Sequence, residues 1–320
     1  MSAVFEAPKV DCHCHILDPA RFPYAADVAY RPAGQETGSA DYLRALLAVY
    51  GVRHALLVQP NSGYGLDNRC MLAAIQRSEG IFKGIAMVPN DASAQQLQDL
   101  QGQGVVGAAF NVALLGHEHY RSIGPLLQRL ADNGMFAQVQ VEGPQMASLA
   151  PMLQGSGVRV LLDHCGRPDV AQGLGEPGFQ AILGLGSSRR AVVKLSGFAK
   201  FSAQAYPFTD LRPYLSALLQ AYGPEHCVWA SDWPFLKAAY RLDYGPLLKL
   251  FEDTVPDATD RHKILWKTPM RLFGFQGAAS GTQHAVAKTI QPRSKHALLP
   301  ARDEIVTVKS VRGLMDQEGI

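Results

Sequence analysis

The stretch VRVLLDHCGR, residues 158–167, joins a short apolar run to polar residues at its end. The run is too short for an ordinary helix and is rich in branched aliphatic side chains, which favours a strand buried on both faces. Asp163 and His164 follow at the carboxyl end, and Gly166 marks the turn beyond them. The stretch therefore predicts a strand of a parallel sheet that presents polar side chains where it ends.

The same kind of run recurs along the chain and gives eight predicted strands: residues 10–15, 55–59, 84–88, 105–111, 137–141, 158–164, 191–196 and 227–232. Segments with helical periodicity separate them, among them Ser39–Tyr50, Ser93–Leu100, Tyr120–Asn133 and Leu211–Tyr222. This alternation is typical of α/β proteins, and a closed (β/α)8 TIM barrel over residues 1–276 is the first expectation. An open doubly wound sheet is the second, although no GxGxxG or P-loop pattern follows any predicted strand.

Composition limits the class of function. Hydrophobic residues make up 47% and charged residues 18% of the chain, so a sizeable core is expected. A formal net charge of +2 is too small to indicate a nucleic-acid or membrane partner. No apolar run approaches the roughly 20 residues of a membrane span, and the first residues lack the pattern of a secretory signal. We expect a cytoplasmic protein, with homo-oligomers left open, and a loosely attached tail over residues 277–320.

Five cysteines are present and none forms a CxxC pair. Cys12 and Cys14 flank His13, which suggests a metal–thiolate site at first sight. Residues two apart in a strand share a face, so we expect His13 and His15 on one face and both cysteines on the other. Buried, reduced thiols are therefore predicted.

In a parallel barrel the active site lies at the carboxyl ends of the strands. The polar residues at those predicted ends are His13, His15, Gln59, Asn111, Gln140, His164, Ser196 and Asp232. Three imidazoles and a carboxylate at one barrel mouth are hard to explain by packing. We therefore predict an active site built on His13, His15, His164 and Asp232.

Four motifs carry a resemblance to a known family: DCHCH (residues 11–15), DHCGR (163–167), KLSG (194–197) and SDWP (231–234). In this order and on these strands they resemble the amidohydrolase-2, or amidohydrolase-related, family. Within it they are similar to the branch of pyrone-dicarboxylate and sugar-acid lactonases, over residues 8–275. The resemblance implies a TIM barrel that hydrolyses a C–O or C–N bond in a small carbonyl substrate.

The resemblance leaves the metal question open. Family members with a full metal site place a Lys or His on the fifth strand, where this chain has Gln138 and Gln140. The favoured expectation is a site without metal. The alternative is one divalent ion, zinc or manganese, held by His13, His15 and Asp232.

Residue chemistry suggests a mechanism. Asp232 can take a proton from water and direct the resulting hydroxide at a lactone carbonyl. The oxyanion then needs hydrogen-bond donors, and His13, His15 and His164 are the candidates.

The expected substrate is a small carboxylate or lactone. Its predicted binding residues are Arg167, Gln59, Tyr64, Gln140, Arg21 and Lys200, with Arg21 in a long loop after the first strand.

The chain departs from the lactonase branch at two positions. Ala109 stands where that branch has a fourth-strand arginine for a substrate carboxylate, and Lys200 stands where it has a second arginine. A lysine is a point charge and lacks the planar fork of arginine. We therefore expect a substrate with fewer carboxylates, or with hydroxyls in their place.

Three alternatives remain beside lactone hydrolysis: a metal-dependent decarboxylase, a lactone isomerase that transfers the acyl group within the molecule, and a barrel that binds a sugar acid without turnover. The decarboxylase normally needs a fifth-strand His. A barrel that only binds has no need for four titratable groups in one mouth.

Overall fold

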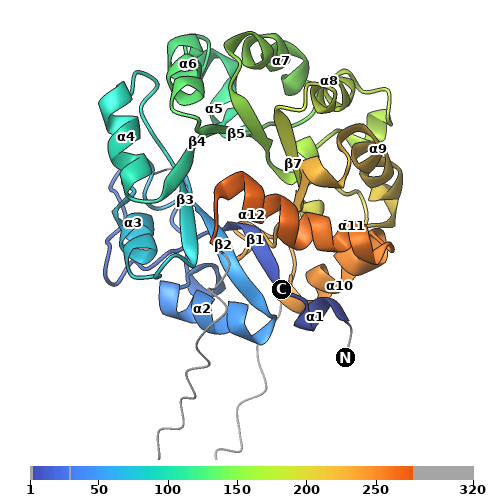
Figure 1. Ribbon diagram of the computed structural model, residues 1–320, viewed down its shortest axis with the longest axis horizontal. Coiled ribbons are helices and arrows are strands. Elements are labelled where there is room, and N and C mark those ends of the chain that lie inside the picture. Colours follow the sequence, from blue (N-terminus) through green and yellow to red (C-terminus); the bar gives the residue numbers. More distant parts are fainter. Residues whose placement is uncertain (1–2, 29, 277–320) are drawn as a thin grey trace, which may run out of the picture. The chain divides into compact units, whose positions relative to one another are not determined.

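The fold is a (β/α)8 barrel, as predicted. A computed structural model describes residues 3–28 and 30–276 (Figure 1). The eight strands are β1 (Lys9–Cys14), β2 (Val52–Val58), β3 (Phe82–Ala86), β4 (Val105–Asn111), β5 (Phe136–Gln140), β6 (Arg159–Leu162), β7 (Ala191–Leu195) and β8 (Cys227–Trp229). They pair in parallel in sequence order, and a bridge between Cys14 and Trp233 joins the last strand to the first. The tail predicted over residues 277–320 lies outside the described residues.

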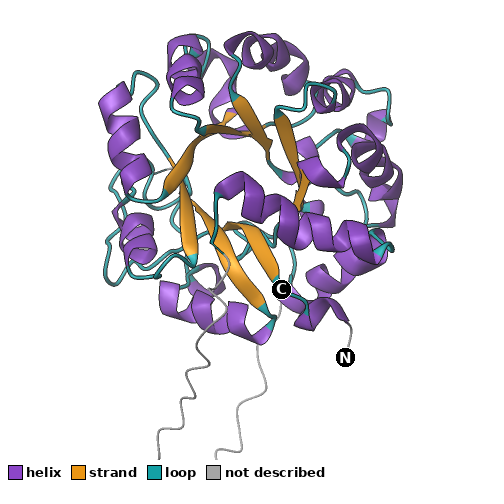
Figure 2. Cartoon of the chain, viewed as in Figure 1, coloured by secondary structure: helices purple, strands orange, loops and turns teal. Residues whose placement is uncertain are grey.

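Helices surround the ring of strands (Figure 2). They are α1 (Ala3–Glu6), α2 (Ala40–Val49), α3 (Arg69–Gln76), α4 (Ala94–Gly102), α5 (Val112–His119), α6 (Gly124–Asp132), α7 (Gln145–Ser156), α8 (Pro177–Gly186), α9 (Arg212–Tyr222), α10 (Tyr244–Thr254), α11 (Ala258–His262) and α12 (Thr268–Phe273). The predicted caps are present: the Ser39 hydroxyl accepts from the Tyr42 amide, and Ser93 forms a capping box with Gln96.

The helix predicted over Tyr120–Asn133 is present as α6, but its predicted start is wrong. Tyr120 is the C-cap of α5, and α6 begins at Gly124, so this part of the chain is divided between two helices. Two local signals explain the division: Asn111 caps α5 by accepting from the Leu114 amide, and Pro125 has the fixed φ that suits the first turn of a helix.

Buried apolar residues form two layers. The larger lies between the strands and the surrounding helices, and the smaller fills the barrel with Val10, Leu56 and Phe136. Phe273 and Phe275, at and just beyond the end of α12, pack into the smaller layer. Figure 1 shows α12 lying across one mouth of the barrel.

The expectation that Cys12 and Cys14 share a face is wrong. Cys12 belongs to the layer inside the barrel and Cys14 to the outer layer, because the register of β1 against β2 shifts between Asp11 and Cys14. All five cysteines are buried and free. Among residues 3–28 and 30–276, no helix combines the length and apolar character needed to cross a membrane.

Candidate active site

A cavity of about 450 Å³ opens at the carboxyl ends of the strands. Every polar residue predicted at a strand end lines it: His13, His15, Gln59, Asn111, Gln140, His164, Ser196 and Asp232. Its volume lies in the range of small-molecule sites. The cavity therefore gathers side chains that come from seven different strand ends.

The Asp232 carboxylate is at the centre of this group. Its Oδ1 lies 3.7 Å from His13 Nε2, 3.8 Å from His15 Nε2 and 3.6 Å from His164 Nε2. Its Oδ2 lies 3.0 Å from Lys200 Nζ. One carboxylate oxygen thus faces three imidazoles, and the other is held by an ammonium group.

The backbone that presents these groups is strained. Asp232 has φ +64°, and His164 and Cys165 have φ +50° and +57°. Such values are uncommon for residues other than glycine and cluster at functional sites. The Asp232 amide donates to the His13 carbonyl at 3.0 Å, so the β8–β1 closure fixes the position of the carboxylate.

Gly197 makes room for the His164 ring. A Cβ at this position would lie 2.6 Å from His164 Cγ, and Gly197 has φ +65°. The ring also meets Ser196, whose Oγ lies 3.0 Å from His164 Nδ1. The Ser-Gly pair of the KLSG motif therefore positions His164.

Burial keeps the imidazoles neutral. It lowers the pKa of His13 to about 3, with Lys194 adding to the effect, and it lowers the pKa of His164 to about 4. Burial also lowers the pKa of His15. Burial opposes ionisation of Asp232, but Lys200 and the three imidazoles outweigh it and hold the pKa of Asp232 below its ordinary value. At neutral pH the site holds a carboxylate and three neutral rings.

His15 cannot be a donor at Nε2 while it is neutral, which corrects its predicted role in binding the oxyanion. Its Nδ1 lies 2.8 Å from the Val58 carbonyl oxygen, which can only accept a hydrogen bond. The proton of neutral His15 is therefore on Nδ1. Its Nε2 faces Asp232 and His13 as an acceptor.

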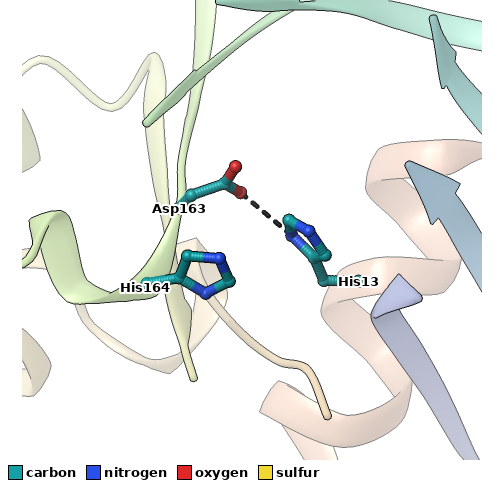
Figure 3. A group of neighbouring side chains, drawn as sticks. All are labelled: His13, Asp163 and His164. Carbon is teal, nitrogen blue, oxygen red and sulfur yellow. Dashed lines mark hydrogen bonds and ion pairs between the residues drawn. The ribbon is translucent and has the colours of Figure 1, made fainter. Parts of the chain in front are cut away.

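A buried polar group that the strand-end reasoning did not select lies beside the imidazoles. Lys194 on β7 is fully buried, and its Nζ lies 2.9 Å from Asp163 Oδ1 and 2.7 Å from Gln138 Oε1. Asp163 Oδ1 also lies 3.2 Å from His13 Nδ1, the contact drawn in Figure 3. A lysine inside the apolar run AVVKL, residues 191–195, is the sequence signal that could have identified this group.

Four predicted substrate-binding residues line the cavity: Gln59, Gln140, Arg167 and Lys200. The Gln59 amide nitrogen donates to the backbone oxygens of Gly65 and Asp67, which orients the side chain. Arg167 donates to Glu142 Oε2 at 2.6 Å, so its charge is already paired. Ala109 also lines the cavity, where the lactonase branch would place an arginine.

The other two predicted substrate-binding residues are not part of the cavity wall. Tyr64 is buried, and its hydroxyl accepts from the Asp18 amide, so it supports the loop after β1. Arg21 is exposed, with its guanidinium carbon 5.8 Å from the centre of the Phe22 ring. Both predictions relied on position in the sequence. Arg21 is in the loop after β1 and Tyr64 in the loop after β2, and neither side chain lines the cavity.

Two groups of side chains in the described ranges could hold a metal ion: His13, His15 and Asp232, as predicted, and His13, Asp163 and His164. Their ligand atoms lie within 4.8 Å of one another, and the residue types suit zinc. However, each carboxylate already has an ammonium group within hydrogen-bond distance, Lys194 at Asp163 and Lys200 at Asp232. A divalent ion would add two charges to a buried site that is already neutral, so these groups fit a metal ion poorly.

Comparison with known proteins found a matching family model, curated relatives and similar solved structures. The amidohydrolase family model matches residues 10–275. A 4-sulfomuconolactone hydrolase of Rhizobium radiobacter is 32% identical over 284 residues, covering 84% of this chain and 92% of that protein. A D-galactarolactone isomerase of Agrobacterium fabrum is 24% identical over 272 residues, covering 84% and 92%. A structure from Pseudomonas putida, provisionally assigned as a 2-pyrone-4,6-dicarboxylic acid hydrolase, is 32% identical with a TM-score of 0.73, covering 84% of this chain and 98% of that one.

Proposed function

The chain belongs to the amidohydrolase family, and from that premise we propose that it is a hydrolase that opens a small lactone. One observation carries the proposal: the ionised Asp232 carboxylate faces the Nε2 atoms of three neutral imidazoles within 3.8 Å. A base beside several polarising groups is what water attack on a carbonyl requires. The relatives that act on lactones support the choice of substrate.

In the proposed reaction, a water molecule donates one hydrogen to Asp232 Oδ1 and the other to His15 Nε2, two acceptors 3.8 Å apart. The water replaces His13 as the donor to His15 Nε2, which leaves the His13 N–H for the substrate. The lone pair of the water is then free to attack the lactone carbonyl. Asp232 takes the proton as the new C–O bond forms, and N–H groups of His13 and His164 stabilise the oxyanion. When the intermediate collapses, the ring C–O bond breaks and Asp232 returns the proton to the leaving alkoxide.

The low pKa of Asp232 makes it a weak base in the free protein, and Lys200 is the first of the charges that lower it. Lys200 is only partly buried, with 27% of its side chain exposed, so it can turn toward a bound substrate. We propose that an anionic or carbonyl oxygen of the substrate draws Lys200 away. Asp232 then becomes a stronger base only when a substrate is present.

We further propose that the reaction proceeds without a metal ion. Lys194 and Lys200 supply two positive charges against the two carboxylates, and the fifth strand carries Gln138 where a metal site has Lys or His. The decarboxylase alternative needs such an ion and is disfavoured for the same reason.

The substrate is proposed to carry hydroxyls in place of a second carboxylate. Ala109 offers no charge, and Arg167 is paired with Glu142. Gln140 and Asn61 add amide groups to the same cavity, with Asn61 oriented by a hydrogen bond from Asn111, and amides bind hydroxyls well.

A panel of lactones with proton release as the readout tests the function. Hydroxylated aldonolactones and mono-acids are expected to be hydrolysed, and the pyrone dicarboxylate is expected to react slowly. NMR of the products separates hydrolysis from isomerisation, because only hydrolysis yields the open hydroxy acid. If no lactone in the panel reacts, the proposal is wrong.

A further inference from the structure

Three polar atoms lie within 3.0 Å of Lys194 Nζ, which carries three hydrogens: two are hydrogen-bond partners, and the third is the ion-paired Asp163 oxygen. Lys194 Nζ lies 2.7 Å from Gln138 Oε1, 2.9 Å from Asp163 Oδ1 and 3.0 Å from His13 Nδ1. The side chain is fully buried, so no water competes for these positions. An ammonium group donates three hydrogen bonds and accepts none.

The first two partners can only accept. The Gln138 amide nitrogen donates to Asp163 Oδ2 at 2.9 Å, which turns the Gln138 carbonyl oxygen toward Lys194. Asp163 is ionised, because Lys194 and His13 outweigh the effect of burial and lower its pKa. The third hydrogen of Lys194 is therefore left for His13 Nδ1.

Two arrangements compete at His13 Nδ1. It could donate to Asp163 Oδ1 at 3.2 Å, or accept from Lys194 at 3.0 Å. In the first arrangement, an imidazole N–H and an ammonium group would meet as two donors at 3.0 Å, which is unfavourable in a buried site. The contact with Lys194 therefore favours an unprotonated Nδ1.

The other side of the His13 ring gives the same answer independently. His13 Nε2 lies 3.3 Å from His15 Nε2, and a hydrogen bond between two ring nitrogens needs one hydrogen. His15 cannot supply it, because its own hydrogen is on Nδ1 and directed at the Val58 carbonyl. Only His13 Nε2 can supply the hydrogen of this 3.3 Å contact, which therefore also favours the Nε2–H tautomer.

We propose that Lys194 is a positioning residue that holds His13 in the Nε2–H tautomer. The donor of His13 then faces Asp232 and the cavity, where the proposed lactone hydrolysis places its oxyanion; the catalytic part of this inference rests on that proposed function. The same tautomer takes away the Nε2 lone pair that a metal ion held by His13, His15 and Asp232 would need from His13. In the HxH motif of this chain, His13 Nε2 is then a hydrogen-bond donor and His15 Nε2 is an acceptor.

Histidine-labelled full-length protein tests the tautomer directly by ¹⁵N NMR, with the His13 signals assigned by their loss in His13→Gln. We expect the wild-type protein to show a protonated Nε2 and an unprotonated Nδ1. In Lys194→Met, a charge-assisted hydrogen bond from Nδ1 to ionised Asp163 is expected to outweigh the neutral contact with His15, so Nδ1 is expected to become protonated. A protonated Nδ1 in the wild-type protein, or an unchanged tautomer in Lys194→Met, would overturn the proposal.

Kinetics provides a second readout. Loss of one oxyanion donor typically lowers kcat by about 10²–10³-fold, and we expect this fall in Lys194→Met with little change in KM. The matched control is Lys9→Met, which also removes a fully buried lysine, but one whose Nζ contacts the backbone oxygens of Phe5 and Tyr50. An equal fall in kcat in both variants would overturn the positioning role.

The two readouts fail in distinguishable ways. If the protein hydrolyses no lactone, the proposed function is wrong, while the NMR still decides the tautomer. If Lys194→Met does not fold, a protonated Nδ1 in the wild-type protein still overturns the proposal.

Discussion

Lys200 and Asp232 form an ion pair in the cavity wall, with Nζ 3.0 Å from Oδ2, while Oδ1 of the same carboxylate faces the imidazoles. The ion pair holds Oδ2 of the carboxylate and leaves Oδ1 free to accept a proton. Because Lys200 is partly exposed and Asp232 is buried, the lysine is the partner that can move.

Asp232→Asn is expected to abolish lactone hydrolysis and leave the fold intact. The amide keeps the shape of the side chain but cannot accept a proton from water, and a general base contributes typically about 10²–10⁴-fold to a rate. Steady-state rates with circular dichroism as a folding control measure this. Asp67→Asn, at an ion pair with exposed Arg69, is the matched control and should keep full activity.

Lys200→Met is expected to move the acid limb of the kcat/KM profile to higher pH. Lys200 lowers the pKa of Asp232, so without it the carboxylate becomes protonated at a higher pH than in the wild-type protein. A pH series on both proteins measures the displacement. Lys237→Met removes another lysine that lines the cavity, one that lies over the Tyr30 ring, and should leave the limb unchanged. If the acid limb is also unchanged in Lys200→Met, Lys200 does not control the pKa of the catalytic base.

Stability should fall as the pH decreases from about 6.5 toward 4. His13 and His164 have folded-state pKa values of about 3 and about 4, below the ordinary value of 6.5. Between these limits the unfolded chain binds protons that the folded chain does not, so the free energy of unfolding decreases as the pH falls. Below about 4, protonation of Asp163 and Asp232 in the unfolded chain adds to the loss, since their folded pKa values are lowered.

Urea midpoints measured between pH 7 and pH 4 test this dependence. His164→Asn should flatten it, because one of the groups that gain protons on unfolding is gone. His262→Asn removes an exposed histidine and should leave the slope as it is. A midpoint that stays constant across this range would contradict the prediction.

Treatment with a chelator, followed by gel filtration, should leave the lactonase activity unchanged. Two ammonium groups already balance the two buried carboxylates, and no step of the proposed mechanism needs an ion. Metal analysis of the same samples gives the control. Activity lost with the metal and restored by zinc or manganese would refute the metal-free proposal.

Ala109→Arg should increase activity on a lactone dicarboxylate relative to a neutral hydroxylated lactone. Ala109 lines the cavity, and a guanidinium group there could form a paired hydrogen bond to a carboxylate. Ratios of kcat/KM for the two substrates measure the change, with Ala109→Met as the control for side-chain volume. Equal ratios in both variants would show that charge at this position does not set specificity.

The sequence by itself determined the barrel and the centre of its site. Strand and helix periods are local properties of the chain, and the carboxyl ends of parallel strands meet at one mouth, so His13, His15, His164 and Asp232 could be predicted together. The tertiary structure decided what local patterns do not encode. Lys194 is 181 residues from His13 and 56 residues from Gln138 in the sequence. Only strand register and barrel closure bring these side chains into contact.

The same dependence on tertiary structure explains why some predictions from the sequence were wrong. The shifted register of β1 separates Cys12 from Cys14, and the paths of the loops after β1 and β2 keep Arg21 and Tyr64 out of the cavity wall. The tertiary structure also determines which ring nitrogen of each histidine carries the hydrogen. The Val58 carbonyl oxygen contacts His15 and the Lys194 ammonium group contacts His13, and both partners come from other strands. The sequence supplied the imidazoles, and the packing of the barrel decided whether each one donates or accepts.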